Sequence, residues 1–286
     1  MKVYDHRLTP ARPDLAAEHL RNTIVAPRYA KGVPQIVFDG SADLRRAPVP
    51  DAPLETEALH GEIFTVYDRD EEGWSWGQLA RDGYVGFMPS KSLTADIAEP
   101  THRVAVLRSF LYGGPSIKLP PMASLSLGSR VSIVGRKDAL SITHRGHYIF
   151  SDHLVPIADI EPDFVAVSER FMGVPYYWGG KTSLGLDCSG LVQVSLGAAG
   201  IEVLRDTDMQ EKSVGEPLSL NADLKRGDLI FWKGHVGIMQ DSHELLHASG
   251  HQMLVVSEPL KTTVDRIEAK GGGPITSIRR LPKLSA

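Results

Sequence analysis

The residues with the clearest capacity for chemistry are one cysteine and two histidines in the C-terminal half of the chain. Cys188 is the only cysteine among 286 residues, so an internal disulfide is impossible and the thiol is either inert packing or a nucleophile. His235 lies in the sequence HVGIM, and His247 lies in HELLHAS. A thiol, an imidazole base and a polar group that orients the base are the components of nucleophilic catalysis by cysteine.

The residues HELLH at 243–247 also match HExxH, the pattern of zinc peptidases. Two such histidines bind one ion on a helix, where positions i and i+4 lie about 5–6 Å apart. The turn-forming residues 240–242 and Gly250 favour a strand here, and His243 and His247 would then be roughly 13 Å apart at about 3.3 Å per residue. We therefore expect no metal and no cofactor, and a zinc peptidase stays open as an alternative.

The two histidine segments read as neighbouring strands of a hairpin about Asp241. In an idealised antiparallel pair, His235 then faces His247 directly, and their Cβ atoms lie about 4.5–5.5 Å apart. Such a pair would provide a base and the group that orients it.

Cys188 lies in LGLDCSGLVQVSLGAAG, where a turn leads into a helix. Its place in the first helical turn predicts a thiol pKa lowered by the unpaired backbone amides, and lowered further by a neighbouring imidazolium. The amide of Cys188 could also contribute to an oxyanion hole. The alternative is a buried, unreactive cysteine on an apolar helix. Asp187 and Ser189 favour a position beside a surface cleft, and we include both among the expected substrate-binding residues.

The elements that position these residues fall into four segments. Residues 1–32 contain an amphipathic run with Asp14 as a candidate N-cap, which predicts a helical segment. Short strands separated by Gly, Pro and Asp follow, and they predict two small all-β barrels at 33–97 and 98–160. Residues 161–286 contain helical runs and then several strands, which is typical of an α+β domain.

The composition is that of a soluble globular protein, with 42% hydrophobic and 23% charged residues. The net charge of −4 and the absence of Lys/Arg runs give no indication of nucleic-acid binding. No apolar stretch is long enough to span a bilayer, and the N-terminal residues lack the apolar core of a signal peptide. We therefore expect a cytoplasmic protein.

Parts of the barrels resemble a known domain. SWGQLARDGYVGFMPSKSL and ALSITHRGHYIFSDHLVPI align loosely with each other. Both resemble bacterial SH3-like domains, clearly in the first copy and weakly in the second. The resemblance implies that each barrel ends with a short helical turn.

Residues 162–286 resemble the NlpC-type family of cell-wall cysteine peptidases, which have a papain-like core. The resemblance is carried, in order, by VPYYWGG, LDCSGLVQ, RGDLIFW, GHVGIM and ELLHASG. It implies that Cys188 is the nucleophile, His235 the base and His247 the orienting residue. His243 and Glu244 would then be bystanders.

Two SH3-like modules before this core resemble the γ-D-glutamyl-L-diamino acid endopeptidases of that family. These cleave peptidoglycan stem peptides that have a free N-terminal L-Ala. The resemblance implies substrate contacts by Tyr176, twelve residues before Cys188, by Asp206, which would bind the α-amine, and by Thr207. Asp206 could instead cap a helix over TDMQEKS, and Tyr176 could be a core residue. Trp178 is expected to be structural. An aromatic residue of the first module would line the cleft, with candidates Trp74, Trp76 and Tyr84. For Trp76 and Tyr84 we favour the alternative, a place in the core of the barrel.

The sequence thus predicts a cysteine endopeptidase that hydrolyses the γ-D-Glu bond to diaminopimelate or lysine, recycling wall fragments. A non-catalytic wall-binding protein and a related cysteine amidase or acyltransferase remain alternatives. The sequence does not distinguish diaminopimelate from lysine, and it does not give the oligomeric state.

Overall fold

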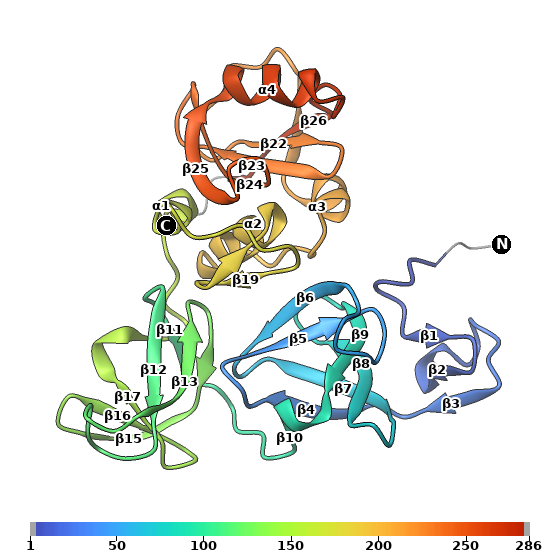
Figure 1. Ribbon diagram of the computed structural model, residues 1–286, viewed down its shortest axis with the longest axis vertical. Helices are drawn as coiled ribbons and strands as arrows, with labels where there is room; N and C mark the ends of the chain where they lie inside the picture. Colours follow the sequence, from blue (N-terminus) through green and yellow to red (C-terminus); the bar gives the residue numbers. More distant parts are fainter. Residues whose placement is uncertain (1–3, 283–286) are drawn as a thin grey trace. The chain divides into compact units, whose positions relative to one another are not determined.

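The computed structural model describes residues 4–282, and the chain forms two compact units, residues 1–158 and 159–286 (Figure 1). The first three predicted segments fall almost wholly in the first unit, and the predicted α+β segment is the second. Residues 1–3 and 283–286, which belong to the predicted segments 1–32 and 161–286, lie outside the described residues. None of the helices within residues 4–282 is long and apolar enough to cross a bilayer.

The predicted helix in the N-terminal segment is wrong. The described part contains β1 (Ala11–Arg12), β2 (Leu15–Ala17), the 3-10 turn η1 (Glu18–Leu20) and β3 (Arg28–Ala30). All three residues of β2 are buried, which a one-faced surface helix would not allow. Asp14 accepts hydrogen bonds from Arg12 and Arg28 and caps no helix. Tertiary packing and ion pairs therefore override the local helical pattern.

The first all-β module follows directly. Its strands form one sheet in the order β10-β4-β7-β8-β9-β5-β6. Their bounds are β4 (Val33–Val37), β5 (Ser41–Arg45), β6 (Leu54–Leu59), β7 (Ile63–Arg69), β8 (Trp74–Leu79), β9 (Val85–Pro89) and β10 (Leu93–Thr94). The short turn η2 (Ser90–Ser92) precedes the last strand, which confirms the expected helical turn.

The second all-β module has two sheets, in the orders β14-β11-β18 and β13-β12-β17-β16-β15. A small apolar core, with Val104, Leu125 and Ile149 fully buried, holds them together. The turn η3 (Ser151–His153) again precedes the final strand, as expected. The strand bounds are β11 (His102–Val104), β12 (Arg108–Tyr112), β13 (Pro121–Ser126), β14 (Arg130–Val131), β15 (Ile133–Lys137), β16 (Leu140–Thr143), β17 (Tyr148–Phe150) and β18 (Leu154–Pro156).

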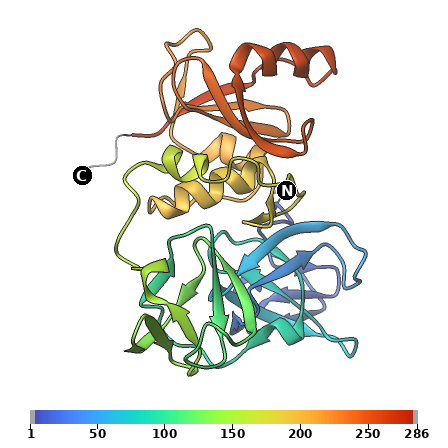
Figure 2. The same ribbon diagram turned by 60° about the vertical axis from the view of Figure 1, so that its left-hand side comes forward.

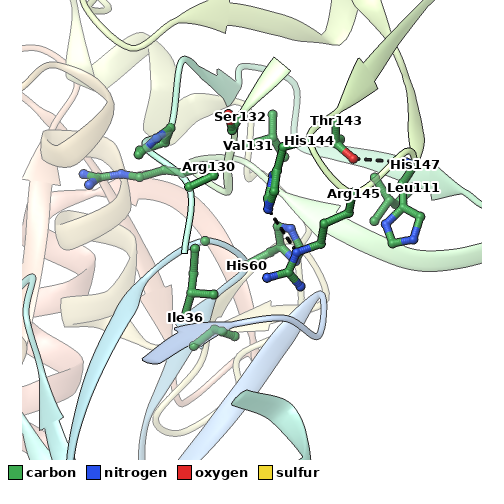
Figure 3. Close-up of a pocket in the computed structure, with 14 residues that line it drawn as sticks. Ile36, His60, Leu111, Arg130, Val131, Ser132, Thr143, His144, Arg145 and His147 are labelled. Carbon is green, nitrogen blue, oxygen red and sulfur yellow. Dashed lines mark hydrogen bonds between the residues drawn. The ribbon is translucent and has the colours of Figure 1, made fainter. Parts of the chain in front are cut away.

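The two modules meet within the first unit at a junction rich in histidine and arginine (Figure 3). The backbone N–H of Arg130 donates to the carbonyl of His60 at 2.9 Å. Gly61 has a φ of +83°, and a Cβ there would lie 2.2 Å from the Arg130 carbonyl oxygen, so glycine is required. The space left among these residues is about 20 Å³. That volume holds about one water molecule, so the junction is packed rather than a ligand site.

The second unit is built around a six-stranded antiparallel sheet in the order β21-β26-β22-β23-β24-β25. The order of helices and strands along the chain confirms the α+β prediction. The elements are α1 (Phe164–Glu169), β19 (Lys181–Thr182), β20 (Gly185–Leu186), α2 (Cys188–Ala198), α3 (Thr207–Ser213), β21 (Glu216–Leu218), β22 (Leu229–Trp232), β23 (His235–Met239), β24 (Glu244–Ser249), β25 (Leu254–Pro259), α4 (Leu260–Ala269) and β26 (Ser277–Arg280).

Helices cover both faces of this sheet (Figures 1 and 2). Helix α4 packs its apolar side chains on a cluster that includes Ile230, Trp232 and Leu245. Helix α2 packs against β23 and β24 on the opposite face, and ten of its eleven residues are buried. Helix α2 is therefore a core helix, held in a fixed position relative to the two strands that contain the histidines.

Candidate active site

Cys188 is the first residue of α2, as the sequence predicts. Asp187 precedes the helix in an extended conformation, and its carboxylate accepts a hydrogen bond from the Gly190 backbone N–H at 2.7 Å. A Cβ at Gly190 would lie 2.2 Å from the carbonyl oxygen of Gly180. The DCSG sequence thus combines an N-cap, the thiol and a glycine that allows the preceding loop to approach the helix closely.

The side chains of Asp187 and Ser189 bond to other protein groups, and their expected contact with substrate stays a prediction. Both are buried and contact Arg205, whose side chain is only 1% exposed. The Arg205 guanidinium donates to both carboxylate oxygens of Asp187, at 3.0 and 2.8 Å, and to the Ser189 hydroxyl at 2.8 Å. Asp187 also accepts from the Gly179 backbone N–H at 2.8 Å. These polar side chains therefore satisfy one another inside the protein and fix the start of α2.

The two histidines lie on adjacent strands, but the predicted register is shifted by two residues. Strand β23 pairs with β24 through Ile238 opposite Leu246 and Met239 opposite Leu245. His235 and His247 are thus diagonal neighbours on one face of the sheet rather than directly opposed. Their imidazoles still meet, with His235 Nε2 and His247 Nδ1 2.7 Å apart. A shift of two residues leaves both side chains on the same face, so the predicted pair forms despite the error.

A carboxylate that sequence analysis does not identify completes this row. Glu258 on β25 lies 2.9 Å from His247 Nε2 through its Oε1 atom. The carboxylate also accepts hydrogen bonds from the Thr263 hydroxyl at 2.8 Å and from the Arg266 guanidinium. Arg266, followed by His247 and Thr263, lowers the pKa of Glu258 to about 2, so the carboxylate is ionised. The signal in the sequence is weak, because Glu258 is one acidic residue at the end of a strand.

The ionised Glu258 determines the tautomers of both imidazoles. Because the carboxylate only accepts, His247 carries its proton on Nε2 and its Nδ1 is an acceptor. His235 must then donate from Nε2 to His247, which leaves His235 Nδ1 with a free lone pair. Burial lowers the pKa of His235 to about 3 and also lowers that of His247, so both rings are neutral at pH 7. The arrangement thus produces a neutral imidazole whose basic nitrogen is Nδ1.

The thiol lies against the strand that contains His235. The backbone N–H of Val236, the next residue, donates to Sγ, and the Thr207 hydroxyl lies 3.8 Å from Sγ. Cys188 is only 6% exposed, and burial raises its pKa to about 11, with Asp187 contributing. The expected lowering of the thiol pKa is therefore wrong. The helix terminus and the hydrogen bonds favour the thiolate, but the cost of removing a charge from water is larger.

Tyr176 and Thr207, two further expected substrate-binding residues, lie near the Cys188 thiol. The third, Asp206, is the residue before Thr207. Tyr176 is partly buried, and burial together with the nearby Cys188 and Asp187 raises its pKa well above the ordinary value. Thr207 is buried beside the sulfur, and Asp206 precedes it, half-buried, at the start of α3. Asp206 occupies the N-cap position of α3, over the expected residues TDMQEKS, but its side chain makes no capping hydrogen bond.

The HELLH segment has no helical geometry. Strand β24 begins at Glu244, and His243 lies in the preceding loop, where its ring contacts the Ser242 hydroxyl at 2.7 Å. His247 is buried in the hydrogen-bonded row described above. Two histidines placed in this way do not form the one-turn chelate that the HExxH pattern requires.

The three aromatic residues of the first module that are candidates for the cleft differ in solvent exposure. Trp76 and Tyr84 are core residues of the first module, whereas Trp74 is partly exposed. Trp178 in the second unit is 67% exposed, so its expected structural role is wrong.

The residues around this site match a known family. The pattern that describes the NlpC/P60 family matches residues 173–266, which contain the thiol, both imidazoles and Glu258. These residues are an NlpC/P60 domain. Residues 44–93 match the bacterial dipeptidyl-peptidase SH3 domain. The chain therefore combines an SH3-like module with an NlpC/P60 peptidase domain.

Two relatives match most of the chain. It is 28% identical over 243 residues to a γ-D-glutamyl-L-lysine dipeptidyl-peptidase of Bacillus cereus, covering 73% of this chain and 71% of the relative. It is 29% identical over 237 residues to dipeptidyl-peptidase 6 of Lysinibacillus sphaericus, covering 75% and 87%. A crystal structure of an NlpC/P60 family protein from Bacillus cereus matches with a TM-score of 0.74 and 24% identity, over 87% of this chain and 100% of that chain. The structural match shows that this chain has the fold of that protein.

Proposed function

We propose that this protein is a cysteine endopeptidase that hydrolyses the γ-D-Glu to diamino acid bond of peptidoglycan stem peptides with a free N-terminal L-Ala. The observation that carries the proposal is the hydrogen-bonded row His235–His247–Glu258 on the strands next to Cys188. The row gives His235 a defined tautomer, and the backbone N–H of Val236, the next residue, donates to the one thiol of the chain. The name of the Bacillus cereus relative, a γ-D-glutamyl-L-lysine dipeptidyl-peptidase, supports a bond between γ-D-Glu and a diamino acid.

In the proposed mechanism the thiol and His235 react from their neutral forms. As Sγ attacks the γ-carbonyl carbon, its proton passes to His235 Nδ1 and the carbonyl electron pair moves to oxygen. The resulting imidazolium is stabilised through His247 by Glu258, and backbone amides at the start of α2 stabilise the oxyanion.

The intermediate then collapses. The C–N bond breaks, and His235 Nδ1–H gives its proton to the departing amine, which leaves an L-Ala-γ-D-Glu thioester on Cys188. Water attacks this thioester and gives a proton to His235, and the proton returns to sulfur as the C–S bond breaks. Every proton transfer uses the same nitrogen.

The free amine of the substrate is recognised, in this proposal, by the carboxylate of Asp206. A carboxylate facing an ammonium forms a charge-assisted hydrogen bond, and an N-acetylated peptide loses both the charge and two of the donors. Tyr176 contacts the acyl part of the substrate beside the thiol, and Thr207 stabilises the sulfur as charge develops on it.

The experiment compares L-Ala-γ-D-Glu-diamino acid tripeptides with a free or an acetylated N-terminus. We expect cleavage of the free peptide between Glu and the diamino acid, and loss of at least about 10⁴-fold in kcat/KM in Cys188→Ala. We expect EDTA to have no effect. Asp206→Asn should lower kcat/KM for the free peptide about tenfold or more without changing that for the acetylated one.

A non-catalytic peptide-binding protein is the second candidate, and the buried, weakly acidic thiol favours it. It predicts binding of the tripeptide without turnover, and equal affinity in the wild type and Cys188→Ala. Acyl transfer by the same site would be detected as an amide product when an amine is added. The place of action, which we propose to be the cytoplasm, can be tested by cell fractionation.

A further inference from the structure

A cavity of about 210 Å³ lies beside the imidazole pair. Its wall contains His235, His247 and Trp232, together with Arg266 and Lys270 from the C-terminal end of α4. At about 30 Å³ for each molecule, the cavity has room for roughly seven waters, which is the size of an amino-acid side chain. The indole N–H of Trp232 has no hydrogen-bond partner among residues 4–282.

The charged groups in the wall are cationic. These groups are Lys233, Arg266 and Lys270, and no Asp or Glu of the described residues lines the cavity. Arg266 is committed to Glu258, whereas Lys270 donates one hydrogen bond, to His251 Nδ1 at 2.8 Å. An ammonium group has three donors, so Lys270 keeps two for a ligand. The partial negative charge at the end of α4 weakens this field but does not reverse it.

The position of the cavity relates it to one side of the scissile bond. In the proposed mechanism His235 Nδ1 protonates the departing amine, so the amino acid that carries this amine must contact the His235 ring. The cavity shares that ring as part of its wall. Through this ring the cavity is next to the position of the departing amine in the proposed mechanism.

We propose that this cavity is the leaving-group subsite and that it binds a carboxylate of the departing amino acid through Lys270 and Lys233. The inference rests on the proposed function, because it needs a leaving amino acid. The carboxylate has two possible sources, the main-chain carboxylate of a tripeptide and the side-chain carboxylate of diaminopimelate. A lysine side chain places an ammonium group among like charges. The subsite therefore favours diaminopimelate over lysine at the third position of the stem peptide.

Four tripeptides distinguish the two sources. L-Ala-γ-D-Glu is joined to meso-diaminopimelate or to L-Lys, and each is prepared with a free or an amidated main-chain carboxylate. We expect the diaminopimelate amide to exceed the lysine amide about tenfold in kcat/KM, which is the size of one charge-assisted hydrogen bond. If kcat/KM differs only between peptides with a free and an amidated main-chain carboxylate, the subsite binds the main-chain carboxylate. Equal cleavage of all four, or preference for the lysine amide, would overturn the subsite and leave the proposed function intact. Cleavage of none would count against both.

Charge-changing variants link the preference to the cavity. Lys270→Gln should lower the ratio of kcat/KM for the diaminopimelate amide to that for the lysine amide from about tenfold towards one. The double variant Lys233→Gln/Lys270→Gln should lower it further. The change should come from a higher KM for the diaminopimelate substrate. Lys270→Glu should reverse it in favour of the lysine amide. Lys261→Gln is the matched control, because Lys261 lies on the same helix, is highly exposed and pairs with Asp265. An unchanged preference in the double variant would contradict the assignment.

Discussion

At the scale of single residues, the candidate site depends on a hydrogen-bond acceptor, Glu258, that is separated from the thiol by the imidazoles of His235 and His247. Glu258 contacts neither the sulfur nor the base, yet it determines which nitrogen of His235 is basic. It is a positioning residue. Its own position depends on Thr263 and Arg266, so the C-terminal helix takes part in defining the proton transfer.

Replacing this carboxylate by an amide should disrupt the tautomers without removing a side chain. We expect Glu258→Gln to lower kcat by about 10²-fold or more with little change in KM, because the His235–His247 pair loses its fixed direction. Steady-state kinetics on the free tripeptide measures both parameters. Glu268→Gln, an exposed change on α4, is the control and should be neutral. A kcat within about twofold of wild type would show that a neutral amide at this position orients His247 as well as the carboxylate does.

The lowered pKa of His235 predicts how kcat/KM depends on pH on the acid side of neutrality. Protonation would inactivate the base, and burial holds its pKa near 3 instead of the ordinary 6.5, so kcat/KM should stay level as the pH falls through 6.5. Rates measured between pH 4 and 8 test this. An acid limb centred at 6.5 would contradict it.

That measurement needs a check of folding, because the same groups affect stability. The unfolded chain binds protons at His235 and His247 below pH 6.5 and the folded chain does not, so stability falls as the pH drops through that range. Glu258, with its lowered pKa, contributes stability above its unfolded pKa near 4.5, and this is lost as the pH falls towards 2. Circular dichroism at each pH identifies the range in which the enzyme is folded.

The sequence predicts the three central residues because their types are rare and chemically distinctive. A lone cysteine at a helix start and two histidines on strand-like segments restrict the possibilities strongly. Glu258 and Arg266 could not be predicted in the same way, since acidic and basic residues on a helix or strand are usually solvated. The burial that changes the pKa of Cys188 is a property of the packed unit and has no local signal.

At the scale of elements, the start of α2 is held by an ion pair inside the protein. The Arg205 side chain satisfies Asp187 and Ser189, and breaking such a pair leaves a buried charge without a partner. Asp187 is also the N-cap that orients the first turn of the helix. The position of the thiol therefore depends on a residue seventeen positions further along the chain.

Removing the guanidinium should destabilise the second unit strongly. We expect Arg205→Met to lower the free energy of unfolding by about 3 kcal/mol or more. Denaturant unfolding provides the measurement. Arg170→Met is the matched control, because Arg170 pairs with Glu161 at a more exposed site and should cost less than about 1 kcal/mol. Equal effects of the two substitutions would show that burial of the Arg205 pair is energetically unimportant.

Elements with strong local signals could be predicted, and those that depend on tertiary packing could not. Helix α2 and the β23–β24 hairpin follow from Gly-bounded apolar runs. The hairpin register could not be obtained, because an Asx-type turn, in which Asp241 accepts from the His243 and Glu244 amides, sets the loop length. A local sequence pattern predicts the N-terminal helix, but buried contacts and ion pairs override that pattern and strands form instead.

At the scale of the whole molecule, the chain has separate apolar cores in its two compact units. Units with their own cores unfold independently unless the interface between them is large and apolar. In the proposed function the peptidase chemistry is contained in the second unit, since Cys188, His235, His247 and Glu258 all belong to it.

Calorimetry should therefore resolve two unfolding transitions, and Arg205→Met should lower the temperature of only one. With a loss of about 3 kcal/mol in a unit of this size, the shift should be on the order of 10 °C. The identity of the shifted transition can be checked by the loss of activity on heating. A single transition that moves as a whole would indicate that the two units unfold together.

The pairing of β23 with β24 restricts how the turn between them can change during evolution or engineering. If the hairpin gained one residue while keeping its compact turn, β24 would slide by a single position, and the imidazole of His247 would point towards α2. Sliding by two would return it to the correct side. Insertions and deletions at this tip are therefore expected in even numbers, unless the extra residue bulges out of the loop.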